Sequence, residues 1–139
     1  MQEEFKQKLI HEVIAQNPFA KYLGVEVVDI QEGYALGRVH FEQKHMNLYG
    51  GMHGGCSYAL ADTIGGISVL TYGKYVTTVN SSMNYMKRVI DTEYVYCEAE
   101  VIHHGNRIST VRVRILNDER DILMEGTMTY YALHAIEMQ

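Results

Sequence analysis

The most constraining feature of this sequence is a long segment, residues 54–71, that is apolar on nearly every side. Its apolar residues recur at helical spacing, and Asp62 is the only charged residue among them. A helix that is apolar nearly all round is normally a buried one. The sequence therefore predicts a buried helix over 54–71, which the rest of the chain must cover.

Strand-like segments lie on both sides of this helix. Before it, GVEVVDI and YALGRVHF are separated by Gln31-Glu32-Gly33, which predicts a hairpin turn. After it, the segment YVTTVNSSMNYM and three segments with alternating apolar and polar residues predict four consecutive strands. An antiparallel sheet must bury its apolar face, and the apolar helix is the candidate to cover it. The predicted fold class is α+β, with the hotdog arrangement of an antiparallel β-sheet wrapped around a central α-helix.

Length and composition bound the remaining possibilities. The 139 residues, 47% of them hydrophobic, suit a single domain over 1–139. An amphipathic helix is expected over 3–16, within an N-terminal segment 1–17 that Pro18 ends. The formal net charge of -5 argues against general nucleic-acid binding. No apolar segment approaches the roughly 20 residues of a membrane span, and no signal peptide precedes the fold, so we expect a cytoplasmic protein with reduced Cys56 and Cys97.

One motif connects the loop before the helix to the helix itself: Asn47, then His53-Gly54-Gly55, then Asp62. With the element order, it resembles the signature of hotdog-fold acyl-CoA thioesterases of the phenylacetate-degradation (PaaI-like) family. The resemblance covers residues 20–133 and continues in VTTVNSSMNYM, where Thr78 stands at a position that the family fills with Ser or Thr. It implies hydrolysis of an acyl-CoA thioester to a free acid and CoA, with no metal or other cofactor.

The resemblance also implies a role for each motif residue. The backbone N–H of Gly55 would polarise the thioester carbonyl at the helix N-terminus, and Gly54 would let the carbonyl approach without meeting a Cβ. Asp62 would activate water as a base, or attack directly as a nucleophile. Asn47 and Thr78 would position the water or the carboxylate, and His53 would support the oxyanion site through hydrogen bonds.

The spacing of Gly55 and Asp62 has a consequence for assembly. Seven residues separate them, so they lie on nearly the same helix face but about 10.5 Å apart along the axis. One carbonyl group cannot contact both residues of a single helix. We therefore expect a site shared between two antiparallel copies of the helix, which makes a homodimer the minimum assembly. The family places its site at such an interface and commonly pairs dimers into tetramers.

Several basic or imidazole side chains are candidates to bind the phosphates of CoA, with a solvated surface role as the alternative for each. They are Lys87, Arg88, His103, His104 and Arg107. The segment Met86-Lys87-Arg88-Val89 lacks the Pro that the family often carries nearby. The sequence therefore departs from the family pattern at the segment that would guide the path of CoA. The remaining histidines show no metal-ligand spacing.

Other readings of the same residues stay open at this point. Asp62 can be a buried carboxylate with a purely structural role. Cys56, in the first helical turn and three residues from His53, can form a Cys–His nucleophile or simply pack in the core. Two other functions share the fold: an acyl-thioester hydratase or dehydratase, and a non-catalytic acyl-CoA sensor.

Overall fold

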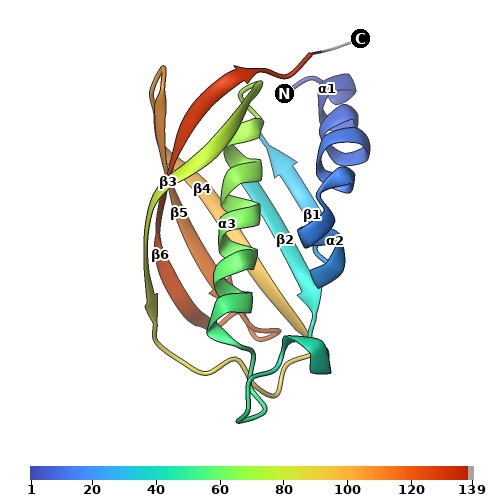
Figure 1. Cartoon of the computed structure of the whole chain (residues 1–139), viewed down its shortest axis with the longest axis vertical. Coiled ribbons are helices and arrows are strands. Elements are labelled where there is room, and N and C mark those ends of the chain that lie inside the picture. Colours follow the sequence, from blue (N-terminus) through green and yellow to red (C-terminus); the bar gives the residue numbers. More distant parts are fainter. Residues whose placement is uncertain (138–139) are drawn as a thin grey trace.

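The helix α3 (Gly54–Leu70) lies lengthwise against one face of a six-stranded antiparallel sheet in the computed structural model, which describes residues 1–137 (Figure 1). The strand order is β1-β2-β4-β5-β6-β3, so the strand that follows α3 directly lies at the far edge of the sheet. This arrangement confirms the predicted α+β hotdog fold.

All six predicted strands are present. Gly33, with φ +75°, makes the predicted turn between the first two. The strands are β1 (Glu26–Gln31), β2 (Tyr34–His40), β3 (Lys74–Tyr85), β4 (Tyr94–His104), β5 (Ile108–Leu116) and β6 (Ile122–Ala135).

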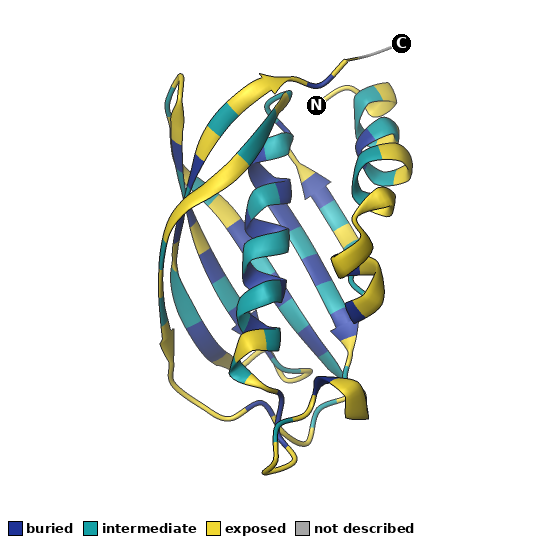
Figure 2. Cartoon of the chain, viewed as in Figure 1, coloured by how far each residue is buried: buried dark blue, intermediate teal, exposed yellow. Residues whose placement is uncertain are grey.

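The core lies between α3 and the inner face of the sheet. Leu60, Ala61 and Ile64 of α3 are fully buried, and β4 and β5 present every second residue to them. Figure 2 shows this alternation as bands of buried and partly exposed residues along the central strands. The period of two in the sequence therefore corresponds to the two faces of the sheet.

The N-terminal segment is helical over the predicted range, and an additional helix follows it. α1 (Glu3–Lys8) continues as a π-helical turn over Leu9–Val13 and a 3₁₀ turn over Ile14–Gln16. A further helix, α2 (Pro18–Leu23), then starts at the proline. Pro18 occupies the first helical position, where its missing N–H costs nothing. None of the helices within residues 1–137 is long and apolar enough to cross a membrane.

The strand β3 forms an exposed edge of the sheet. It pairs with β6 alone among the described strands, and most of its residues are exposed (Figure 2). A long edge strand presents a row of unpaired backbone N–H and C=O groups, which natural proteins usually cover or pair. This edge runs alongside α3, so any partner that pairs with it would also lie close to that helix.

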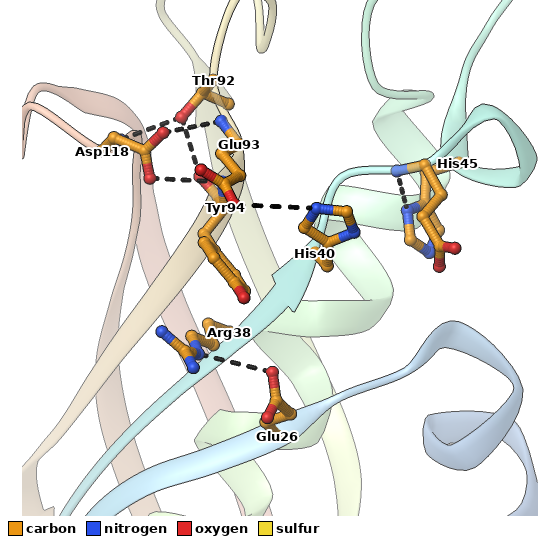
Figure 3. A network of polar contacts seen from close by, with 9 residues as sticks. Glu26, Arg38, His40, His45, Thr92, Glu93, Tyr94 and Asp118 are labelled. Atoms are coloured by element: carbon orange, nitrogen blue, oxygen red, sulfur yellow. Dashed lines mark hydrogen bonds and ion pairs between the residues drawn. The ribbon is translucent and has the colours of Figure 1, made fainter.

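A polar network fixes the connection between β3 and β4 to the turn between β5 and β6 (Figure 3). The carboxylate of Asp118 accepts hydrogen bonds from the backbone N–H groups of Glu93, at 2.6 Å, and Tyr94, at 3.2 Å. The Asp118 N–H donates in turn to Thr92 Oγ1 at 2.9 Å. The network holds the start of β4, and thus the end of the connection that carries Lys87 and Arg88.

Candidate active site

The single charge of α3 is held by two hydroxyl groups from the sheet. Thr78 on β3 donates to Asp62 Oδ1 at 2.7 Å. The hydroxyl of Tyr130 on β6 lies 3.2 Å from the same oxygen and 2.9 Å from the Asp62 backbone carbonyl oxygen. Hydrogen bonds to the charged form stabilise a carboxylate in a partly buried position. The structure thus brings together two of the predicted catalytic residues, Asp62 and Thr78.

A second group of predicted residues surrounds a cavity at the N-terminus of α3. The cavity has a volume of about 300 Å³, and Asn47, Gly54, Lys87 and Arg88 are among its lining residues. The hydroxyl of Tyr85 donates to the Gly54 carbonyl at 2.9 Å, and a Cβ at Gly54 would come within 3.1 Å of the Tyr85 ring. Gly54 therefore allows the Tyr85 ring to lie close to the helix, which a residue with a larger side chain would hinder.

Asn47 builds the loop that forms one wall of this cavity. Its side-chain oxygen accepts hydrogen bonds from the N–H groups of Tyr49, at 2.8 Å, and Gly51, at 3.2 Å. These bonds define an Asx-type turn. Arg88 Nη2 donates to the Tyr49 carbonyl at 3.4 Å, which ties the loop to the opposite wall of the cavity.

His53 caps α3. Its Nδ1 accepts a hydrogen bond of 2.8 Å from the N–H of Gly55, which is the donor expected to polarise the substrate carbonyl. In this arrangement His53 Nδ1 is unprotonated, because an N–H group can donate only to a free lone pair. The exposed imidazole of His53 therefore already accepts the hydrogen bond of the Gly55 N–H. A substrate carbonyl must share this N–H with the imidazole or replace the imidazole as its acceptor.

His104 and Arg107 lie at the other end of α3. The ring of His104 stacks on Tyr72, with centroids 3.7 Å apart, near the C-terminal end of the helix. Arg107 donates to the hydroxyl of Tyr131 at 3.3 Å. Figure 1 shows the β4–β5 connection and the β3–β4 connection at opposite ends of the molecule. Within one chain, these two residues are therefore separated from Lys87 and Arg88.

The alternative nucleophile Cys56 is in a less favourable setting. It is partly buried, and burial raises the pKa of its thiol. A raised pKa disfavours the thiolate, which is the reactive form. No cluster of three or more His, Cys, Asp or Glu residues suited to a metal ion occurs in the described part of the chain.

Sequence reasoning missed three tyrosines around this region. Tyr130 contacts Asp62, Tyr85 contacts Gly54, and the Tyr58 hydroxyl on α3 contacts Ser81 Oγ on β3. Tyr58 precedes Asp62 by four residues, or one helical turn, so the sequence spacing alone could have identified Tyr58 as a neighbour of Asp62. The other two depend on which residues the folded strands place beneath the helix.

Comparison with known proteins agrees with the fold and with the predicted family. The profile of the thioesterase superfamily matches residues 49–124, which is 76 of the 139 residues. The acyl-coenzyme A thioesterase PaaI of Escherichia coli K12 is 21% identical over 110 residues, which cover 79% of each chain. The solved structure of E. coli PaaI superposes with a TM-score of 0.88 at 18% identity and covers 95% of both chains.

A second solved structure is a hypothetical thioesterase protein of Streptococcus pneumoniae TIGR4 with coenzyme A. It has a TM-score of 0.77 and 26% identity, and the alignment covers 81% of this chain and 88% of that one. The matched profile spans more than half of the chain and includes the helix α3 with Asp62. The chain therefore belongs to the thioesterase superfamily, with the hotdog fold of PaaI, and is a thioester hydrolase.

Proposed function

We propose that this protein hydrolyses acyl-CoA thioesters to a free acid and CoA, with Asp62 as the base or nucleophile. The observation that carries the proposal is the Asp62 carboxylate, the only charge of α3, which Thr78 holds by a 2.7 Å hydrogen bond. Within residues 1–137 no hydrogen bond reaches its second oxygen, Oδ2. A carboxylate oriented through one oxygen can use the other to activate water or to attack a carbonyl carbon.

The electrophilic half of the site would come from the N-terminus of a second α3. The Gly55 N–H lies there at the positive end of the helix dipole, where it could stabilise a developing oxyanion. Seven residues, or about 10.5 Å along the axis, separate it from Asp62 of the same chain. The proposed site therefore pairs Gly55 of one chain with the partner's Asp62, and the exposed edge of β3 supports a partner at this position.

The CoA portion is proposed to bind at the cavity that Lys87 and Arg88 line. Two cationic side chains beside an opening of about 300 Å³ suit phosphate groups. The S. pneumoniae relative was solved with coenzyme A. In an antiparallel pair, His104 and Arg107 of one chain would approach the Lys87 end of the other, so their predicted phosphate contacts also require the dimer.

The S. pneumoniae thioesterase offers one further argument for the Asp–Thr pair. Structures of two of its mutants were solved, one with an aspartate replaced by alanine and one with a threonine replaced by alanine. Those two positions are 16 residues apart, the same separation as between Asp62 and Thr78. The proposal includes no metal or organic cofactor, and the cytoplasmic location stays a prediction.

Release of free thiol from a panel of short, long and aromatic acyl-CoAs tests the proposal. We expect wild type to hydrolyse members of the panel and Asp62→Asn to lose at least about 100-fold in kcat, because the amide can neither accept a proton nor attack. Asp29→Asn makes the same chemical change on β1 and should retain full activity. Full activity of Asp62→Asn would overturn the mechanism, whereas tight CoA binding without any turnover by wild type would favour a sensor.

A further inference from the structure

Tyr130 is a buried residue, and among residues 1–137 the carboxylate of Asp62 is the only side chain that hydrogen-bonds with its hydroxyl. Its side chain is 2% exposed, and its hydroxyl lies 3.2 Å from Asp62 Oδ1 and 2.9 Å from the Asp62 carbonyl oxygen. A buried hydroxyl without a partner costs free energy, so this contact fixes both groups. Phenylalanine would fill the same space, so packing alone does not explain the hydroxyl.

Strand register places this hydroxyl beside Thr78. Thr78 and Tyr130 are direct cross-strand partners in the β3–β6 ladder, and a register shift follows immediately between Thr78 and Asn80. Both side chains of the pair therefore reach Asp62 Oδ1 from neighbouring strands. Thr78 lies on the exposed edge strand, whereas Tyr130 is buried in the core.

A glycine of α3 provides the space that the hydroxyl occupies. A Cβ at Gly65 would lie 2.5 Å from the Tyr130 hydroxyl oxygen, which is closer than real Cβ contacts. Glycine in the middle of a helix costs roughly 1 kcal/mol relative to alanine. The helix thus carries a destabilising residue at the position where the tyrosine hydroxyl must fit.

We propose that Tyr130 is a positioning residue that, together with Thr78, holds Asp62 through Oδ1 and leaves Oδ2 as the reacting oxygen. This inference rests on the proposed function, because it assigns the reacting oxygen of the proposed catalytic carboxylate. The single hydroxyl proton of Tyr130 is shared between the Asp62 carboxylate and the backbone carbonyl of the same residue, so one tyrosine contacts both the backbone and the side chain of Asp62.

The electrostatic setting keeps Tyr130 in its donor form. Burial, followed by the nearby Asp62 charge, raises the pKa of the Tyr130 hydroxyl. The titratable groups that face it are Asp62 and Tyr58 on α3 and Cys97 on β4. Tyr130 therefore stays protonated and can donate a hydrogen bond to the charged form of Asp62.

Tyr130→Phe tests this role by separating kcat from KM. We expect kcat to fall on the order of tenfold, as for loss of a hydrogen bond to a charged group, with KM changed less than about twofold. The kcat is expressed per folded enzyme, so that a smaller folded fraction does not imitate the effect. Gly65→Ala should lower kcat in the same way, since it displaces the hydroxyl while Tyr130 remains.

Tyr34→Phe is the matched control. It also removes a tyrosine hydroxyl that donates to a carboxylate, Glu98 Oε2 at 3.1 Å, but on β2, away from the site. It should leave kcat and KM unchanged. An unchanged kcat in Tyr130→Phe, or a loss of activity that matches only a smaller folded fraction, would overturn the positioning role.

A substrate-free measurement separates this inference from the proposed function. The ¹³C NMR signal of the Asp62 carboxyl carbon, recorded at pH 7, should move in Tyr130→Phe but not in Tyr34→Phe, because only the first variant removes a hydrogen bond to this carboxylate. If wild type hydrolyses no thioester but the signal moves, the contact between Tyr130 and Asp62 stands and the proposed function fails. If Asp62 is required for turnover and its signal does not move, the function stands and the inference fails.

Discussion

At the scale of single residues, α3 contains two reactive side chains in contrasting surroundings. Asp62 would be costly on an apolar helix without partners, and hydroxyl groups from two strands provide them. Cys56, six residues earlier, has a partly buried thiol whose pKa burial raises. The protein therefore gives the carboxylate of Asp62 two hydroxyl partners, whereas it disfavours the thiolate of Cys56.

This contrast predicts that Cys56→Ser retains thioesterase activity. The serine hydroxyl is nearly isosteric with the thiol, and the proposed mechanism does not use Cys56, so kcat should stay within about twofold of wild type. Free-thiol release by Cys56→Ser and Asp62→Asn, compared in one assay, checks the expectation. A hundredfold loss in Cys56→Ser at normal stability would favour the Cys–His nucleophile instead.

At the scale of elements, register decides which residues meet, and this limits what the sequence could predict. The apolar helix with its single charge and the alternating strands were sufficient to predict α3, the sheet and the candidate Asp62. Thr78 was found only through the resemblance. The contact of Tyr130 with Asp62 spans 68 positions and depends on the β3–β6 register, which no local pattern specifies. The pattern before Pro18 predicts only the end of a helix there, whereas the proline also starts the helix α2.

A prediction about stability concerns Asp118, which holds the end of the connection between β3 and β4. Hydrogen bonds, first that from the Glu93 N–H, lower the pKa of this exposed carboxyl group. A lowered folded-state pKa means that the stabilisation is present above the unfolded pKa of about 3.9 and is lost as pH falls through the folded value. Asp118→Ala should therefore lower the free energy of unfolding by about 1 kcal/mol at pH 7, after discounting for solvent exposure.

Urea denaturation at several pH values measures this effect. The difference between wild type and Asp118→Ala should shrink below about pH 4, where the carboxylate becomes protonated. Asp118→Asn, which keeps a hydrogen-bond acceptor, should lose less stability at pH 7 and show a weaker pH dependence. A difference that stays constant down to pH 2 would show that the charge of Asp118 does not contribute.

At the scale of the whole molecule, the proposed site is incomplete in one chain. Asp62 and the N-terminus of α3 are too far apart on one helix, and His104 and Arg107 lie at the opposite end from the cavity beside Lys87. A two-fold arrangement of antiparallel helices would bring each of these pairs together across the interface. The exposed edge of β3 gives such a partner a place to add to the sheet.

Mixing two inactive variants tests this arrangement directly. Asp62→Asn removes the carboxylate, and Gly55→Pro removes the N–H donor within the first helical turn, where proline is tolerated. If each site takes Gly55 from one chain and Asp62 from the other, a heterodimer of the two variants contains one intact site and one doubly defective site. After subunits are exchanged at a one-to-one ratio, half of the dimers are mixed, so about a quarter of wild-type activity should return. A site contained within one chain would recover none, because every chain in the mixture carries a defect.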